Sequence, residues 1–475
     1  MLIGSERARA PGIAAEAERR VEELGLADLP PRLRRNSRDY YYLSVWPGLL
    51  QLGRPPAEIP WPARVESGYV HLPFCSGLCD FCSYFVVVAR EAQTDPRIPR
   101  HVDDLLRELE LNQARFEVEL SYLYLGGGTP SLLPPDQLER LLTGFRGAGA
   151  LAPRLLGTAE LHPELFGDEA RADAFLDVLE EFGIRRVSIG FQTADEDLLD
   201  GTNRRHGADF APLALERLRT RGFMVNLDLM YGLPDQSLAS WVASLERVLE
   251  LAPDSISTYF MFLDPGTKLR HDVETGAVTL PAHELVQAQH VAAQLVLEEA
   301  GFVELPGDFW SKPEESAELT QAALPSEGAS LGLGAGAYGY YSGMQYFNEF
   351  ALAPYRRALG DGRVPHWRAG VLTAEQQRCR DVMFSLKNSP CLRADLFEAA
   401  HGAAPLDAFP EQFALLDRLE LASVDGGVVR LTPKGRLLVE EIACLFEPPG
   451  HHASAPAGDV RLRRHNFAPT YSAAT

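Results

Sequence analysis

The stretch Tyr69-Val-His-Leu-Pro-Phe-Cys75-Ser-Gly-Leu-Cys79-Asp-Phe-Cys82 carries three cysteines with the spacing C-x3-C-x2-C. Thiolates this close together on a short loop can all ligate one iron–sulfur cluster. A cubane cluster has four irons, so three ligands leave one iron open to a substrate or a cofactor. C-x-x-C pairs also occur in zinc sites, but such a site needs a fourth Cys or His, and His71 is the only near candidate. The spacing therefore favours an iron–sulfur cluster.

Together with its flanking Tyr-x-His-x-Pro-Phe-Cys, this stretch resembles the cluster loop of radical S-adenosylmethionine (SAM) enzymes, in particular the branch of oxygen-independent coproporphyrinogen III oxidase. The resemblance covers about residues 66–445. It implies that Cys75, Cys79 and Cys82 ligate a 4Fe–4S cluster and that SAM chelates the open iron. It also implies that an electron, from a flavodoxin- or ferredoxin-like donor, splits SAM into methionine and a 5′-deoxyadenosyl radical.

The composition is that of a soluble globular protein, with 475 residues, 46% of them hydrophobic and 23% charged. The formal net charge of −21 argues against nucleic-acid binding and favours an enzyme that acts on small molecules. No stretch is long and apolar enough to span a membrane, and Met1 to Ala10 lacks the apolar region of a secretory signal. Six cysteines, three of them clustered, fit a reducing cytosol, so we expect a cytoplasmic protein without a membrane partner. We interpret the other three, Cys379, Cys391 and Cys444, as packed core thiols.

From residue 68 onward, short apolar runs alternate with amphipathic segments of helical period. Strand–helix alternation predicts parallel strands joined by right-handed crossovers, here an α/β fold with a partial (β/α)6 barrel like that of radical SAM enzymes. In such barrels the chemistry lies at the carboxyl ends of the strands. The expected strands are Gly68–Leu72, Ser121–Leu125, Gly157–Leu161, Arg186–Gly190, Met224–Met230 and Ser255–Met261.

The same pattern divides the chain into five parts. We expect an N-terminal extension over 1–65, the barrel over 66–300, a connecting Gly- and aromatic-rich segment over 301–371, a winged-helix-like domain over 372–446 and a disordered tail over 447–475. The small domain is expected to contain helices over Gln376–Leu386, Arg393–Ala400 and Pro410–Leu419, a hairpin around Gly426-Gly427 and a closing helix over Pro433–Phe446. Because this domain is not basic, we interpret it as a lid over the barrel rather than a DNA-binding module.

Polar and glycine residues follow the expected strands at their carboxyl ends. Glycines allow a close approach of the backbone to a ligand, an arginine suits a carboxylate, and an aspartate suits an amine or ribose hydroxyls. Each of these residues could instead be a satisfied buried polar group. The resemblance implies that the first SAM is held by Tyr69, Gly127 and Glu160, with Phe81 as a further cofactor contact, and that a second SAM is held by Gly128, Thr129, Gln192, Arg204 and Asp228.

The chain departs from its relatives in two places. The oxidase carries a cysteine where this chain has Tyr84, and the related heme chaperone carries a His-Asn-x-x-Tyr-Trp motif where this chain has Leu305 to Lys312 without a His-Asn pair. With two SAM sites, these departures favour C-methylation or methylene transfer (cyclopropanation) on an aromatic or heterocyclic natural product, a partner methyltransferase completing ring closure.

Two alternatives remain. The first is oxidative decarboxylation of coproporphyrinogen, or modification of heme. Four propionates would then be bound by cations such as Arg204, Arg205, Lys268 and Arg270. The second is a heme-binding chaperone, which the missing His-Asn pair disfavours. The aromatic residues Phe309, Trp310, Tyr338, Tyr340, Tyr341, Tyr346 and Phe347 fit either stacking on a flat ligand or core packing.

Overall fold

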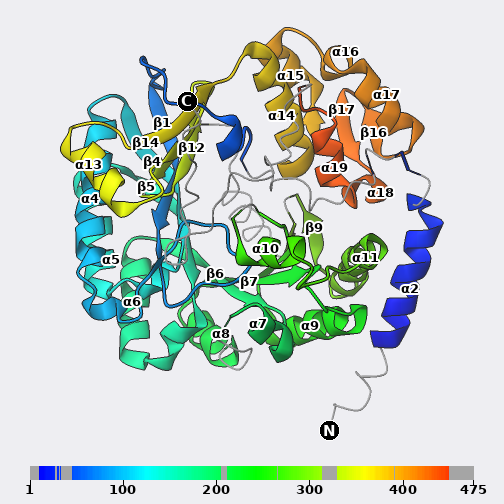
Figure 1. Ribbon diagram of the computed structural model, residues 1–475, viewed down its shortest axis with the longest axis horizontal. Helices are drawn as coiled ribbons and strands as arrows, with labels where there is room; N and C mark the ends of the chain where they lie inside the picture. The colour runs from blue at the N-terminus through cyan, green and yellow to red at the C-terminus, as the bar shows by residue number, and fades with distance from the viewer. Residues whose placement is uncertain are drawn as a thin grey trace.

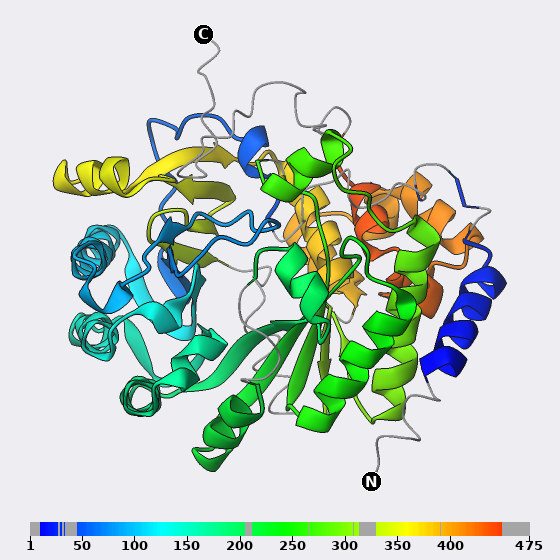
Figure 2. The ribbon, with the colours of Figure 1, turned by 60° about the horizontal axis from the view of Figure 1, so that its bottom comes forward.

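A twelve-stranded mixed sheet forms the centre of the molecule (Figures 1 and 2). The computed structural model describes residues 10–26, 29–30, 33, 45–204, 211–264, 266–306, 308–312, 329–389 and 391–448. Arg205 and residues 449–475 of the expected tail lie outside the described residues.

The six predicted strands are all present as the parallel middle of this sheet, so the predicted radical SAM partial barrel is confirmed. Each strand pairs in parallel with the next along the chain, as strand–helix alternation requires. Several begin or end outside the predicted limits, where the apolar pattern fades into polar residues. The strands are β1 (Arg64–Leu72), β4 (Glu117–Gly127), β5 (Leu151–Leu161), β6 (Ile184–Gln192), β7 (Met224–Tyr231) and β8 (Ser255–Phe260).

Both edges of the sheet continue into the segment that the sequence suggested was only a connection. On one side, β11 (Ser330–Leu333) runs parallel to β1, and the antiparallel strands β12 (Tyr338–Tyr341), β13 (Met344–Asn348) and β14 (His366–Val371) follow it. On the other, β10 (Phe309–Ser311) and β9 (Val303–Leu305) pair antiparallel beyond β8. These strands are short and rich in Gly and aromatic residues, which hides their alternation in the sequence.

Helices cover the outer face of the sheet, as Figures 1 and 2 show. The N-terminal helix packs against two of them, α9 and α11. The helices are α2 (Ala10–Glu23), α4 (Arg97–Gln113), α5 (Pro135–Gly147), α6 (Glu169–Glu181), α7 (Glu196–Gly201), α8 (Ala211–Thr220), α9 (Leu238–Leu251), α10 (Lys268–Glu274), α11 (His283–Glu299) and α13 (Leu352–Gly360), with short 3-10 turns over Leu49–Gln51, Ala92–Thr94, Pro130–Leu132 and Pro163–Gly167.

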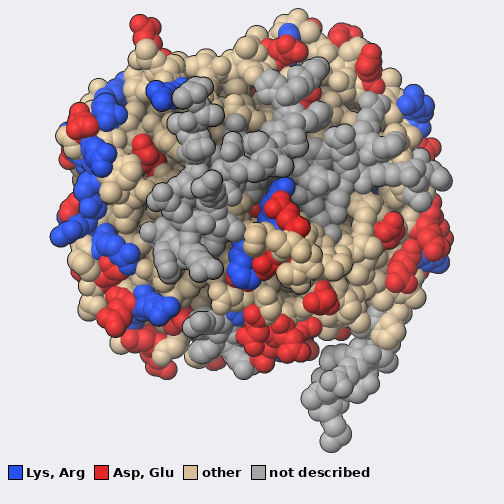
Figure 3. Space-filling view, in the orientation of Figure 1, with Lys and Arg blue, Asp and Glu red and all other residues tan. Residues whose placement is uncertain are grey.

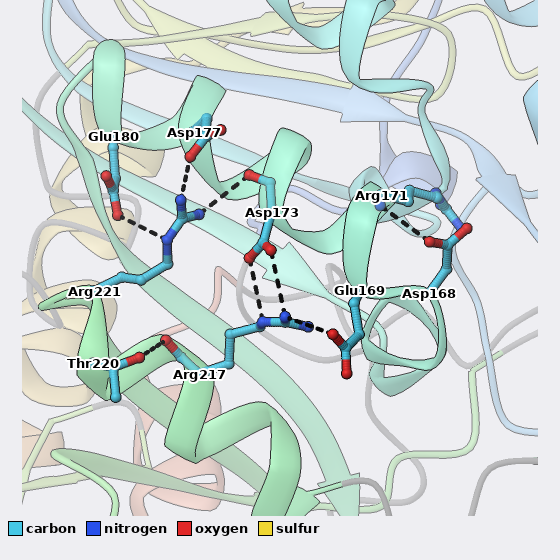
Figure 4. Close-up of polar contacts among 9 residues, drawn as sticks. All are labelled: Asp168, Glu169, Arg171, Asp173, Asp177, Glu180, Arg217, Thr220 and Arg221. Carbon is cyan, nitrogen blue, oxygen red and sulfur yellow. Dashed lines mark hydrogen bonds and ion pairs between the residues drawn. The ribbon is translucent and has the colours of Figure 1, made fainter.

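Arg217 of α8 and Arg221, which directly follows this helix, form ion pairs with α6 (Figure 4). Arg217 contacts Glu169 and Asp173, and Arg221 contacts Asp177 and Glu180. Three of the four carboxylates are largely exposed, so each pair adds well under about 1 kcal/mol. These ion pairs therefore add little to the stability of the fold.

The C-terminal part is a separate three-stranded sheet with helices. The sheet has the order β15 (Leu392–Arg393), β17 (Val428–Leu431), β16 (Ala422–Asp425), and the predicted hairpin is present as β16–β17. The helices are α14 (Ala374–Asn388), α15 (Ala394–His401), α16 (Pro405–Ala408), α17 (Pro410–Arg418), α18 (Pro433–Arg436) and α19 (Val439–Cys444). The closing helix expected over Pro433–Phe446 is thus two short helices.

Charged side chains are unevenly spread over the face shown in Figure 3. In Figure 3, Lys and Arg side chains gather along the edge that α4 and α5 occupy, and Asp and Glu side chains gather along the edge of α6 to α9. Among the described residues, no helix combines the length and apolar character needed to cross a membrane.

Candidate functional site

One cavity of about 1110 Å³ opens at the carboxyl ends of the central strands, and every predicted site residue lines it. β1, β4, β5, β6 and β7 each contribute at their carboxyl ends, as expected for a barrel. The predicted residues on its wall are Tyr69, Cys75, Cys79, Phe81, Cys82, Gly127, Gly128, Thr129, Glu160, Gln192, Arg204 and Asp228. No described residue of 372–446 lines this cavity, and the lid interpretation of the small domain stays a prediction.

The cysteine loop follows β1 and is closed by a two-residue parallel ladder. Strand β2 (Phe74–Cys75) enters the loop and β3 (Val87–Val88) leaves it. The backbone N–H of Ala89 donates to the carbonyl of Cys75 at 2.8 Å, and inside the loop the N–H of Cys82 donates to the carbonyl of Cys79 at 3.1 Å. The ladder fixes both ends of the loop, which brings its three thiols to one wall of the cavity.

The three thiols are half-buried, and two of them lie next to polar side chains from elsewhere in the barrel. Cys75 Sγ lies 3.1 Å from the Thr129 hydroxyl, and Arg204 Nη1 lies 4.0 Å from Cys79 Sγ. Burial raises the pKa of Cys75 to about 12, and it also raises the pKa of Cys82. Thiolates at these positions therefore need a nearby positive charge, which the irons of a cluster supply.

The three thiols suit a cluster better than a single ion. Among the described residues, no three Cys, His, Asp or Glu side chains converge closely enough to hold one metal ion. A 4Fe–4S cubane instead takes each thiolate on a different iron, so its ligands stay apart. The chemistry and placement of the donors fit the cluster that the sequence predicts.

His71 ties the cysteine loop to β1. Burial lowers the pKa of His71 to about 4, so the ring is neutral. Its Nδ1 accepts from the Tyr69 hydroxyl at 2.6 Å, and its Nε2 donates to the Phe85 carbonyl at 2.9 Å. Gly127 lies against the ring with a φ of 112°, and a Cβ at Gly127 would come within 2.7 Å of His71 Nδ1. Tyr69 and Gly127 are thus held in the cavity wall by the same imidazole.

Glu160 presents a buried carboxyl group to the cavity. Its Oε1 accepts from the Tyr124 hydroxyl at 2.8 Å. Burial raises the pKa of Glu160 to about 7, and the Tyr124 bond opposes this rise only in part. A cationic ligand group, such as the amino group of SAM, would stabilise the carboxylate form.

Asp228 lies in a polar network at the floor of the cavity. Its carboxyl oxygens accept from Ser188 Oγ at 2.9 and 3.0 Å, and Oδ1 accepts from Asn226 Nδ2 at 2.7 Å. Burial raises the pKa of Asp228 despite these bonds. The network aims the carboxyl group, which can bind an amine or hydroxyl groups.

Gln192 and Arg204 meet beside the bulge at the end of β6. Gln192 has a φ of 67°, rare for a residue with a side chain, and the β6–β7 register shifts between Gly190 and Gln192. Arg204 Nη2 donates to the Gly190 carbonyl at 2.7 Å. Gln192 Oε1 is buried without a hydrogen-bond partner among the described residues. A buried acceptor without a donor is costly, so this atom points to a ligand.

The aromatic cluster divides between the two alternatives that the sequence left open. Phe309 and Tyr338 line the cavity, whereas Trp310, Tyr341 and Tyr346 are buried core residues. Trp310 Nε1, for example, donates to Thr258 Oγ1 at 3.1 Å. Sequence reasoning missed several cavity residues, because they belong to no motif and their sequence does not show which face of a strand or loop they occupy. They include Tyr124, Arg186, Ser188, Tyr259 and Asp264.

Other predicted residues lie elsewhere. Lys268 pairs with Asp80 at 2.9 Å and also contacts Asp272, and Arg270 Nε donates to Glu274 at 2.8 Å, so these cations are engaged outside the cavity. Cys379 and Cys444 are buried as expected, but Cys391 is only half-buried, because it begins the short edge strand region of the small sheet.

Comparisons with known proteins agree with this geometry. Residues 69–248 match the model of the radical SAM superfamily. The heme chaperone HemW of Bacillus subtilis is 27% identical over 80% of this chain and 99% of its own length. The anaerobic coproporphyrinogen III oxidase 1 of Cereibacter sphaeroides is 29% identical over 81% of this chain and 87% of its own. The solved structure of coproporphyrinogen III oxidase (HemN) from Escherichia coli matches over 86% of this chain and 96% of its own, with a TM-score of 0.73 and 26% identity.

The fold contains a partial barrel like that of radical SAM proteins, and residues 69–248 match that superfamily, a class that implies a 4Fe–4S cluster and SAM as cofactors. Within that superfamily the chain is similar to the coproporphyrinogen oxidases and HemW proteins. The expectation of a two-SAM methyltransferase or cyclopropanase acting on a natural product is wrong, because the relatives that align over four-fifths of the chain are heme chaperones and coproporphyrinogen oxidases. The partner methyltransferase was expected only for that reaction, so this expectation is withdrawn as well. The error has a physical reason: the motifs that bind the cofactors do not specify the substrate.

Proposed function

We propose that this protein is a radical SAM oxidase of the coproporphyrinogen III oxidase type, which converts a propionate side chain of a porphyrinogen into a vinyl group. The observation that carries the proposal is the convergence of the cysteine loop and the strand-end polar residues on a single cavity of about 1110 Å³. The likeness to HemN over almost the whole length of that enzyme supports it. A cavity of this size is large enough for a flat macrocycle or for SAM together with part of one.

The chain's own residues would divide the work as follows. Cys75, Cys79 and Cys82 would hold the cluster, and Tyr69, Phe81, Gly127 and Glu160 would hold SAM beside it. When bound, the cluster and SAM supply hydrogen-atom abstraction driven by reductive cleavage of SAM. Glu160 would take the amino group of SAM, because its buried carboxyl group gains a cationic partner there.

A second SAM is part of the proposal. Gln192 offers an unpartnered buried acceptor, Arg204 a guanidinium and Asp228 an aimed carboxyl group, all on the same wall. Gly128 and Thr129 complete this side of the cavity. Its Gly128 backbone leaves no room for a side chain, since a Cβ would lie 2.7 Å from the Phe74 carbonyl oxygen. This close packing shapes the wall that the second SAM would contact.

The reaction balances with one external acceptor. One hydrogen atom leaves the propionate carbon that bears the ring and ends in 5′-deoxyadenosine. The carboxylate then leaves as carbon dioxide, the vinyl double bond forms, and one electron passes to a one-electron acceptor such as an oxidised flavoprotein or iron–sulfur protein. A donor of the same class supplies the electron that cleaves SAM.

The test is an anaerobic assay of the reconstituted protein with reductant, SAM, an electron acceptor and coproporphyrinogen III. We expect a product that has lost carbon dioxide and two hydrogens, together with 5′-deoxyadenosine, both seen by mass spectrometry. The Cys79→Ala variant is the control and should form neither. SAM cleavage without any decarboxylated porphyrinogen would contradict the proposed substrate.

The second candidate function is heme binding of the HemW type, favoured by the similarity to two HemW proteins. His162 is the histidine among the described cavity residues, and its Nδ1 accepts from the Glu164 N–H at 3.3 Å. It is therefore already engaged as the cap of a short helix. Stoichiometric heme binding that is lost in His162→Ala, with no decarboxylation, would favour the chaperone over the oxidase.

A further inference from the structure

Arg186 is a buried cation in the cavity wall, and none of the roles above uses it. It lies on β6, two residues before Ser188, and pairs with Thr158 of the neighbouring strand β5. Its side chain lines the cavity, yet the residue is only 2% exposed. Its neighbour Arg185 points to the other face of the strand, where it is exposed and faces Glu180.

Within the described part of the chain, no carboxylate forms a hydrogen bond or ion pair with the Arg186 guanidinium. Among the described residues, Nε and Nη2 of Arg186 are buried and have no hydrogen-bond partner. The two carboxyl groups whose charges act on Arg186 are bonded to other residues: Glu160 accepts from Tyr124, and Asp228 accepts from Ser188 and Asn226. Arg186 instead faces the ring of Phe309, with 5.9 Å between Cζ and the ring centroid.

An unpaired buried guanidinium is expensive, because it loses its hydration and gains no hydrogen bonds in return. Burial lowers the pKa of Arg186, and the surrounding tyrosines and carboxyl groups compensate only in part. Arginine remains charged even so. The site therefore has the donors for a planar anion and lacks the anion itself.

The surroundings favour an organic carboxylate over a small inorganic anion. The guanidinium fork matches a carboxylate in bidentate geometry. Phe309 and Tyr259 line the same cavity and contact each other edge to face, with ring centroids 6.2 Å apart. A carboxylate carried on an apolar or aromatic body would contact both surfaces at once, whereas a small hydrated anion would leave the rings wet.

We propose that Arg186 binds a carboxylate of the molecule that occupies this cavity. Two molecules could supply that group, namely a propionate of the porphyrin-type substrate or the methionyl end of SAM. The first source rests on the proposed function, and the second does not. Of the cations that the sequence suggested for propionates, Arg204 alone lines the cavity among the described residues, and it already donates to Gly190. Arg186 is thus a buried cation of the cavity wall with donors left for a ligand.

The test uses the full-length, anaerobically reconstituted protein and equilibrium binding. The first pair of probes is coproporphyrin III and its neutral tetra-amide, and the second pair is SAM and decarboxylated SAM. A third probe is propionate alone, read as the rise in thermal unfolding temperature relative to chloride at equal ionic strength. The variants are Arg186→Gln, which removes the charge, and Arg186→Lys, which keeps it without the fork. Arg185→Gln is the matched control on the other face of the same strand.

The two supporting outcomes identify the source. If Arg186→Gln weakens the binding of coproporphyrin III at least tenfold but leaves the binding of its tetra-amide and of SAM unchanged, the carboxylate belongs to the substrate. If the substitution weakens the binding of SAM at least tenfold but leaves the binding of decarboxylated SAM unchanged, the carboxylate belongs to SAM. In either case Arg186→Lys should fall between wild type and Arg186→Gln, and propionate should stabilise Arg186→Gln less than it stabilises wild type.

The inference is overturned if Arg186→Gln keeps the wild-type preference for the acid in both pairs and keeps the response to propionate. Failure of the proposed function shows differently, as a wild-type protein that neither decarboxylates coproporphyrinogen III nor binds coproporphyrin III. In that event the SAM pair and propionate still decide the role of Arg186. Cluster absorbance and the thermal unfolding temperature of Arg186→Lys check that the variants are folded.

Discussion

Arg204 and Cys79 are 125 residues apart in the chain, yet the Arg204 guanidinium lies 4.0 Å from the Cys79 thiol. The same guanidinium donates to the Gly190 carbonyl at 2.7 Å, so it is anchored at the end of β6. The side chain before it, Asn203, donates to the Leu78 carbonyl at 2.7 Å inside the cysteine loop. The loop after β6 therefore supports the cysteine loop directly.

We predict that Arg204→Gln makes the cluster harder to reduce. Reduction adds negative charge to the cluster, and a guanidinium next to a ligand thiolate stabilises that charge. The midpoint potential, followed by EPR of the reduced cluster, should move to a more negative value in Arg204→Gln and much less in Arg204→Lys. A potential that is equal in all three proteins would contradict this.

Cys79→Ala should not assemble a stable cluster and should form no 5′-deoxyadenosine, because only two thiolates of the loop remain. The control is Cys391→Ala, whose thiol is half-buried and does not line the cavity. Iron and sulfide content with visible absorbance measure the first effect, and mass spectrometry measures the second. Native rates of SAM cleavage in Cys79→Ala would show that the cluster assignment is wrong.

Gly127→Ala should lower the free energy of unfolding by about 1–3 kcal/mol and weaken SAM binding. The new Cβ would meet the His71 ring at 2.7 Å, and the φ of 112° strains any other residue. Gly147→Ala is the matched control, since it has no atom within 4 Å of the new Cβ. Urea denaturation separates the two variants, and equal stabilities would disprove the crowding at Gly127.

Binding of SAM should release a proton at pH 6. Burial raises the pKa of Glu160 to about 7, so the ligand-free protein holds this proton at pH 6, and a cationic amino group would displace it. In the ligand-free protein this raised pKa makes the contribution of Glu160 to stability fall as pH rises from about 4.5 to about 7. Calorimetry in two buffers of different ionisation enthalpy measures the released proton. The isosteric Glu160→Gln variant should release none, and an equal release from both proteins would remove Glu160 from the SAM site.

Glu304 couples β9 to the small C-terminal sheet and helices. Burial alone would raise the pKa of Glu304, but His290, whose Nε2 lies 3.4 Å from Glu304 Oε1, and the guanidinium of Arg436 lower it to about 2. Arg436 Nε donates to Glu304 at 2.8 Å from α18. A lowered folded pKa gives stability that is present above pH 4.5 and is lost as pH falls toward 2.

Glu304→Gln should therefore cost about 2 kcal/mol at pH 7, and the difference from wild type should shrink as the pH falls below about 4.5. Denaturation at several pH values measures it. Glu299→Gln, at the exposed end of α11, is the control, and its free energy of unfolding should change much less than that of Glu304→Gln. A difference between wild type and Glu304→Gln that stays constant from pH 7 to pH 3 would contradict the charge coupling.

The parts of the fold that follow local rules could be predicted from the sequence. The six central strands alternate with amphipathic helices, and this periodicity is enough to place them and to predict parallel pairing. The edge strands β9 to β14 could not be predicted, because they are short and their pairing depends on partners far along the chain. The break in the closing helix, between α18 and α19, was also not predicted.

The sequence by itself predicted the cofactor chemistry, since the spacing of Cys75, Cys79 and Cys82 keeps three thiols within one short loop. Only the tertiary structure decided which other groups face the cavity. Arg186 and Arg185 are identical neighbours in the sequence, but one is buried without an anion and the other is exposed beside Glu180. Alternation along a strand places the two side chains on opposite faces of the sheet. Only the twist and closure of the sheet decide which of these faces lines the cavity.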